Sequence, residues 1–142
     1  MSFATAFARL GRYTEAAPQF ALVHGPRDLA ASAAYQWARA LVRSGRTEEG
    51  RAALGRVLRL HPRDTTAAST ALFLLADLAS DERADSRARS YLRQLVARYP
   101  SSRLAPTAAF RGAMITLLAG DGRGAAAEFD GLARRYPRSD EA

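Results

Sequence analysis

The sequence contains few side chains that could bind a metal or carry out acid–base catalysis. Among 142 residues there are two histidines, His24 and His61, and no cysteine. A protein metal site needs several convergent histidine, cysteine or carboxylate ligands, and the sequence shows no such cluster. Both histidines fall at positions where repeated copies of the chain carry Leu, Val, Ala or Tyr, which indicates packing. We therefore predict no metal site and no cofactor.

The carboxylates and one glycine-rich segment also favour structural roles. The candidate acids lie in first turns or on exposed faces of predicted helices, where they interact favourably with the helix dipole. These are Glu15, Glu48, Glu82, Asp85 and Glu128. Residues 120–124 (Gly-Asp-Gly-Arg-Gly) suggest a phosphate-binding loop, but they follow a helix and lack the Lys-Ser/Thr ending. We expect a turn there, no catalytic residue and no enzyme activity in this chain.

An internal repeat must position whatever functional residues the chain has. Tyr35, Phe73 and Phe110 begin three copies that are 38 and 37 residues apart, and nine positions keep one register through all three. The clearest columns are the turn position (Gly45, Arg83, Gly120), a small residue (Gly50, Ala88, Ala125) and a closing pair (His61-Pro62, Tyr99-Pro100, Tyr136-Pro137). Such self-similarity is typical of stacked repeat architectures.

Each copy is expected to be a pair of helices. Gly45 has the position of a C-terminal cap, Thr47 that of an N-cap, and Pro62 stops the second helix. Asp64 and Ser102 are predicted to cap the first helices that follow. No alternating strand pattern is present, so the fold class is all-α. The predicted helices are 2–10, 14–24, 28–43, 47–60, 64–80, 85–98, 103–119 and 123–136.

This pattern resembles the tetratricopeptide repeat: helix, glycine turn, second helix with a small and then a large residue, and a closing proline. The resemblance implies an α-solenoid of about eight helices in antiparallel hairpins, forming a right-handed superhelix. We expect one domain over 1–142, with a partial repeat at 1–27 and full repeats at 28–63, 64–101 and 102–138. Because the last predicted helix would leave an apolar stripe uncovered, we also expect a longer parent protein.

The second half of the chain more narrowly resembles the N-terminal superhelical region of bacterial soluble lytic transglycosylases. The segments that carry this resemblance are Ala71–Glu82, Tyr99–Ala113, Ala119–Asp121 and Ala125–Ala142. It implies a non-catalytic scaffold in the periplasm or cell envelope, beside a separate domain that cleaves peptidoglycan with a Glu-Ser pair. The sequence contains no Glu-Ser pair, so no catalytic residue is carried over. The alternative is a stand-alone tetratricopeptide adaptor that binds a protein or peptide.

First helices line the concave surface of such superhelices, so aromatic and basic residues there are the candidate binding residues. They are Tyr35, Trp37, Arg39, Arg43 and Arg111. The net charge is +7, and all 21 basic residues are arginines. They are spread over every predicted helix among acids rather than gathered in one track, so we expect no nucleic-acid partner. We also expect no membrane insertion, since no long apolar run is present, and self-association through the uncovered terminal helix.

Overall fold

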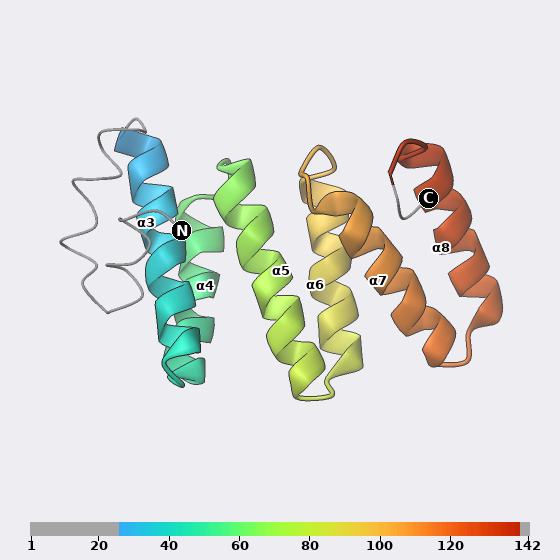
Figure 1. Ribbon diagram of the computed structural model, residues 1–142, viewed down its shortest axis with the longest axis horizontal. Helices are drawn as coiled ribbons and strands as arrows, with labels where there is room; N and C mark the ends of the chain where they lie inside the picture. Colours follow the sequence, from blue (N-terminus) through green and yellow to red (C-terminus); the bar gives the residue numbers. More distant parts are fainter. Residues whose placement is uncertain (1–25, 140–142) are drawn as a thin grey trace. The chain divides into compact units, whose positions relative to one another are not determined.

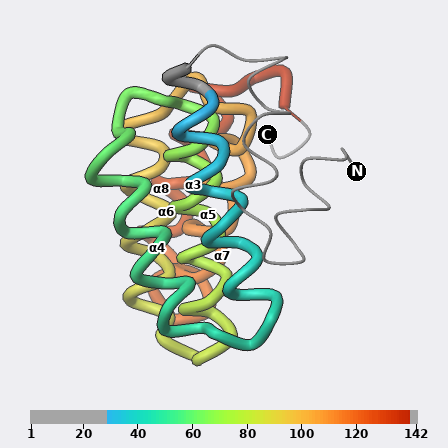
Figure 2. Tube along the Cα trace, turned by 90° about the vertical axis from the view of Figure 1, so that its left-hand side faces the viewer, coloured from blue at the N-terminus to red at the C-terminus, as the bar shows by residue number. Residues whose placement is uncertain are grey.

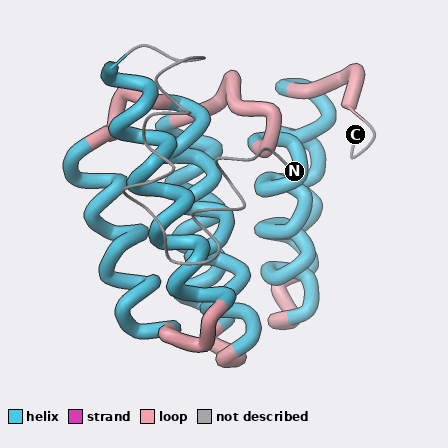
Figure 3. The backbone as a smooth tube through the Cα atoms, turned by 60° about the vertical axis from the view of Figure 1, so that its left-hand side comes forward, coloured by secondary structure: helices cyan, strands magenta, loops and turns pink. Residues whose placement is uncertain are grey.

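The structure is a computed structural model that describes residues 26–139. These residues form six α-helices joined by short loops, and Figure 3 shows only helix and loop in this part of the chain. The helices are α3 (Pro26–Arg43), α4 (Thr47–Leu60), α5 (Thr65–Asp81), α6 (Asp85–Arg98), α7 (Ala105–Leu118) and α8 (Gly122–Arg135). The all-α prediction is confirmed, and both ends of each of the six helices agree with the predicted ends to within two residues. The predicted helices 2–10 and 14–24 lie outside the described residues.

The chain divides into two compact units, residues 1–71 and 72–142, with the division inside α5. In the first unit, α3 and α4 lie side by side as an antiparallel pair (Figures 1 and 2). In the second unit, α7 packs against both α6 and α8 (Figure 1). Each unit therefore buries its helix faces between neighbours along the chain, as expected for hairpins that stack.

The turns within the three hairpins share one backbone geometry. At the end of α3, Gly45 has φ +87°, its N–H donates to the Val42 carbonyl, and the Arg46 N–H donates to the Leu41 carbonyl. This is the Schellman arrangement, which satisfies carbonyls at the end of a helix. Gly120 has φ +94° and closes α7 in the same way. Arg83 adopts this left-handed conformation too, with φ 59°, although its Cβ makes the conformation unfavourable.

The predicted N-caps are only partly correct. Asp64 caps α5, because its Oδ1 accepts from the Ala67 N–H at 2.9 Å. Thr47 is wrong as a cap: it is already helical, and Arg46 occupies the N-cap position without a side-chain hydrogen bond. Ser102 is wrong as a helix cap, because its hydroxyl accepts from the Leu104 N–H and α7 starts only at Ala105.

Close approach of the paired helices depends on small side chains. Ala38, Ala76 and Ala113, one in each first helix, are all buried. Gly50 on α4 faces α3 so closely that a Cβ there would lie 2.5 Å from Val42 Cγ2. The second helices then contribute larger residues, and Leu54, Leu92, Val57, Leu95 and Leu132 are buried. The paired helices therefore pack tightly because small and large side chains alternate along the face that they share.

The second helix of each hairpin also ends in one geometry. His61, Tyr99 and Tyr136 have φ values of −130°, −128° and −129°. In each case the backbone N–H donates to the carbonyl four residues earlier at 2.8 Å. A proline follows each of them, which prevents the helix from continuing.

Candidate binding site

The structure distributes the predicted binding residues over both units. Tyr35, Trp37 and Arg39 are half-buried on α3, and Arg43 is exposed at its end. Arg111 lies on α7 in the second unit. Because the five residues belong to two separate units, their role as one concave binding surface stays a prediction.

Trp37 lines a hollow in the first unit. Its walls come from α3 and α4, its volume is about 340 Å³, and the lining residues are Ala30, Ala34, Trp37, Ala53, Arg56, Leu60 and His61. Leu60, at the edge of this hollow, is 64% exposed. His61 lies at this hollow as a residue of the helix end, the position the repeat predicts for it.

Arg111 takes part in the main polar contact between two first helices of the second unit. Its Nη1 lies 2.9 Å from Asp77 Oδ1 on α5, and its guanidinium carbon lies 4.6 Å from the centre of the Phe73 ring. The ring holds the guanidinium by a cation–π interaction while the carboxylate pairs with it. Both charged side chains are about half exposed, so this arrangement is presented to solvent.

Glu128 on α8 accepts polar contacts from two other helices. Its Oε1 lies 3.1 Å from Arg93 Nη2 and 3.5 Å from Arg89 Nη2, both on α6. The same oxygen lies 2.9 Å from the Thr116 hydroxyl on α7, which is buried. The carboxylate thus neutralises part of the positive charge of α6 and joins all three helices.

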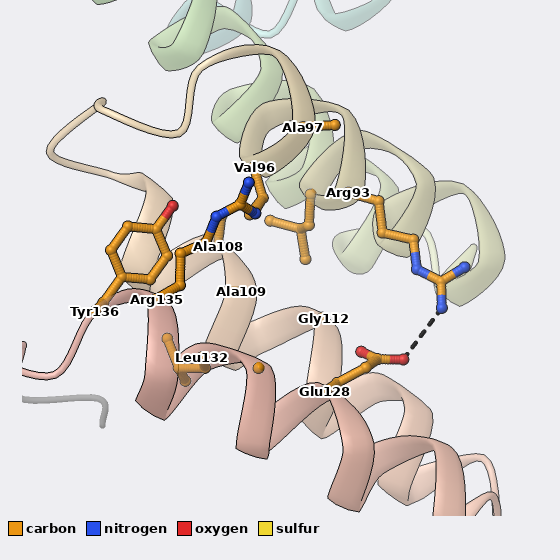
Figure 4. A pocket seen from close by; sticks show the side chains of 12 residues that line it. Arg93, Val96, Ala97, Ala108, Ala109, Gly112, Glu128, Leu132, Arg135 and Tyr136 are labelled. Carbon is orange, nitrogen blue, oxygen red and sulfur yellow. Dashed lines mark hydrogen bonds and ion pairs between the residues drawn. The ribbon is translucent and has the colours of Figure 1, made fainter.

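Beside Glu128 is a cleft that the sequence predictions did not include (Figure 4). It has a volume of about 270 Å³ and lies among α6, α7 and α8. Its lining is Leu92, Arg93, Val96, Ala97, Ala108, Ala109, Gly112, Glu128, Gly131, Leu132, Arg135 and Tyr136. A signal for it was present in the repeat register, because Gly112 stands in the column that holds Trp37 and Leu75 in the other copies.

Tyr99, which follows α6 directly, is a titratable group whose pKa is shifted by its surroundings. Burial raises the pKa of Tyr99, and the positive charge of Arg98 offsets part of that effect. The neutral phenol is therefore the form that the folded state favours. Tyr136, at the equivalent position after α8, donates its hydroxyl to the Pro100 carbonyl at 2.9 Å.

Over residues 26–139, no group of three or more His, Cys, Asp or Glu side chains is arranged to hold a metal ion. None of the helices described in this range has the length and apolar character needed to cross a membrane.

Comparison with known proteins agrees with the helix-pair geometry. A family model described as "Tetratricopeptide repeat" matches residues 35–103. Two solved structures of MamA, from AMB-1 and MSR-1, are similar over 96% and 94% of this chain, with TM-scores of 0.58 and 0.55. The fold is a tetratricopeptide-like α-solenoid.

The similarity to MamA is one of fold. The sequence identities are 18% and 19%, and the matches cover 70% and 73% of the MamA chains. No curated protein matches the chain. Neither the family model nor the two MamA structures supports the narrower resemblance to lytic transglycosylases. Only the tetratricopeptide-like part of that resemblance is confirmed.

Proposed function

We propose that this tetratricopeptide-like chain is a non-catalytic scaffold that binds a protein or peptide partner. The observation that carries the proposal is the arrangement of Arg111, Asp77 and Phe73 on two first helices of the second unit. Arginine and aromatic side chains are enriched at the energetically important positions of protein interfaces. Here the ring fixes the guanidinium in place, so less side-chain entropy is lost when a partner binds.

A stand-alone adaptor is the form of this function that we favour. The MamA structures share the tetratricopeptide-like fold of this chain, which supports a repeat scaffold. The second candidate is the superhelical region of a periplasmic lytic transglycosylase, which rests on the sequence resemblance of residues 71–142. In both cases we place the protein in the periplasm or cell envelope as part of the proposal.

The test is partner capture with charge-reversed variants. Purified chain is immobilised and exposed to cell-envelope extract, and bound proteins are identified and quantified. We expect Arg111→Glu to reduce capture of a specific partner by about tenfold, the effect of losing an important interface residue. Arg123→Glu, an exposed arginine at the start of α8, is the matched control and should leave capture unchanged. The double variant Arg39→Glu/Arg43→Glu tests the predicted surface of α3 in the same assay.

If every charge-reversed variant captured the partner as well as the wild-type chain, neither surface would be the binding site. If no protein were captured specifically, the adaptor proposal would be wrong. Cosedimentation of the chain with purified peptidoglycan separates the second candidate. Binding there without protein capture would favour the lytic-transglycosylase scaffold.

A further inference from the structure

The cleft among α6, α7 and α8 lies where the first helix of the third copy carries smaller side chains than the first helix of the second copy. In the column of Gly112 the other copies hold Trp37 and Leu75, and in the column of Ala109 the second copy holds Leu72. Leu72 and Leu75 are buried. The third copy therefore lacks the bulk that the second copy has at both positions. The first copy has Ala34 at one of them and Trp37, which borders the hollow of the first unit, at the other.

Gly112 is not needed for close helix packing. A Cβ at this position would meet only the Leu92 Cβ, at 4.0 Å, an ordinary van der Waals distance. Gly131, on the α8 wall of the same cleft, would meet nothing within 4 Å. Glycine in a helix is destabilising relative to alanine, so both glycines weaken their helices without a steric reason among the described residues. Neither glycine places a side chain in the cleft.

The cleft has an apolar middle and a basic end on each side. Its inner wall includes Leu92 and Leu132, both buried. Figure 4 shows Arg135 reaching from α8 toward Val96 at one end, and Arg93 reaching from α6 to Glu128 at the other. Glu128 is the one carboxylate in the lining and is already paired. At the Arg93 end, Arg89 and Arg93 share the single Glu128 carboxylate, so one positive charge remains there, and Arg135 supplies another at the opposite end of the apolar floor.

The polar surface continues along α6 from the end marked by Arg93. A second hollow there is lined by Ser86, Arg89, Ser90, Arg93, Gln94 and Ala97. Arg93 and Ala97 line both hollows, so the two lie next to each other. Hydroxyl, amide and guanidinium groups are suitable donors for the carboxylates of a peptide that lies across the cleft.

We infer that this cleft is a second binding site, which takes one bulky apolar side chain from an acidic segment of a partner protein. A volume of about 270 Å³ is below the range of about 300–1,000 Å³ usual for small-molecule pockets, and it suits a single side chain. The flanking arginines select acidic neighbours of that side chain by charge complementarity. The site is separate from Arg111, Asp77 and Phe73, so it extends the proposed function rather than restating it.

The experiment measures fluorescence anisotropy of three labelled pentapeptides added to the full chain at low salt. The probe is Glu-Glu-Trp-Glu-Glu, and the comparisons are Glu-Glu-Ala-Glu-Glu and Lys-Lys-Trp-Lys-Lys. We expect the probe to bind at least about tenfold more tightly than either comparison, since one loses the buried ring and the other reverses the charge. Added salt should weaken the binding.

Variants that fill the cleft locate the binding site. Ala109→Leu restores the residue type of the second copy, and Gly112→Leu occupies the central space. Each should weaken binding of the acidic probe about tenfold or more, while Ala133→Leu, an exposed position on α8 outside the cleft, leaves it unchanged. Arg135→Glu should also weaken binding, whereas Arg138→Glu, an exposed arginine outside the lining, should change it less than about twofold. Circular dichroism verifies folding, and Ala109→Leu carries the test if Gly112→Leu does not fold.

Undiminished probe binding by folded Ala109→Leu, equal binding of the three peptides, or no measurable binding by the wild-type chain would overturn the assignment. An oligonucleotide that bound in place of the acidic peptide would do so as well. Because Arg111 lies outside the cleft, partner capture and its loss in Arg111→Glu report separately on the proposed function.

Discussion

The Glu128 carboxylate on α8 lies 3.1 Å from the Arg93 guanidinium on α6, so an ion pair joins the second helices of two successive hairpins. Arg93 is largely exposed and Glu128 largely covered. The two partners should therefore contribute unequally to stability. The carboxylate also pairs with Arg89 and accepts from the buried Thr116 hydroxyl, whereas among the described residues the exposed Arg93 guanidinium pairs with this carboxylate alone.

We expect Glu128→Ala to lower the free energy of unfolding by about 1–2 kcal/mol, since several donors lose an acceptor at once. Arg93→Ala should cost less than about 0.5 kcal/mol, the usual scale of a surface ion pair. Urea unfolding of both variants measures the difference, and equal losses would show that Glu128 has no special role in joining the helices.

Two glycines on α4 should respond oppositely to the same substitution. Gly50→Ala would place a Cβ 2.5 Å from Val42 Cγ2 and 3.0 Å from the Val42 backbone nitrogen, and we expect a loss of about 1–3 kcal/mol. Gly55→Ala meets nothing within 4 Å and should gain about 0.5–1 kcal/mol from improved helix propensity. Thermal unfolding of the pair checks both signs, and a stabilised Gly50→Ala would mean that α3 and α4 are less closely packed than described.

Arg83 occupies a left-handed turn position that glycine fills in the other two hairpins. Arg83→Gly should raise the free energy of unfolding by about 1 kcal/mol, because it relieves the steric cost of a Cβ at positive φ. Gly120→Ala introduces the same cost at the equivalent turn and should lower stability by a similar amount. Chemical denaturation provides the comparison; no gain from Arg83→Gly would show that the arginine side chain stabilises the turn by other contacts.

Tyr99 makes stability depend on pH in the alkaline range. Its pKa in the folded state is raised above the ordinary value of 10.0 by burial, so the unfolded chain loses this proton first as the pH rises. The stabilisation is complete below pH 10 and declines as the pH rises above it. Denaturant unfolding between pH 8 and pH 11 should show a smaller decline for Tyr99→Phe than for the wild-type chain. Identical profiles would indicate that the other tyrosines account for the decline.

The helices were predictable because their ends are encoded locally. Gly45, Gly120 and the prolines after His61, Tyr99 and Tyr136 act within a few residues of their own position, so spacing alone locates them. Aligning the three copies shows that Arg83 stands where the other two have glycine. It does not show that Arg83 keeps the left-handed backbone conformation of Gly45 and Gly120. Thr47 failed as a cap because the Schellman turn places Arg46, not Thr47, immediately before the helix.

The candidate site was less predictable, because it depends on which side chains are missing. Predictions from residue chemistry favour aromatics and charges such as Trp37 and Arg111, whereas the cleft exists where Ala109 and Gly112 have little or no side chain. Comparing the three copies column by column would have shown the lost volume. Arg93 and Arg135 lie at opposite ends of the cleft because of how α6 and α8 are arranged in space. No pattern along the sequence predicts that arrangement.

The shared backbone geometry at His61, Tyr99 and Tyr136 makes each hairpin an interchangeable building block. The residues that follow α4, α6 and α8 have φ values within two degrees of one another. Each donates its backbone N–H to the carbonyl four residues earlier. An additional hairpin grafted at one of these joints would start from the backbone geometry that its neighbours already use. Gene duplication could therefore lengthen or shorten the array one hairpin at a time, and a protein engineer could do the same.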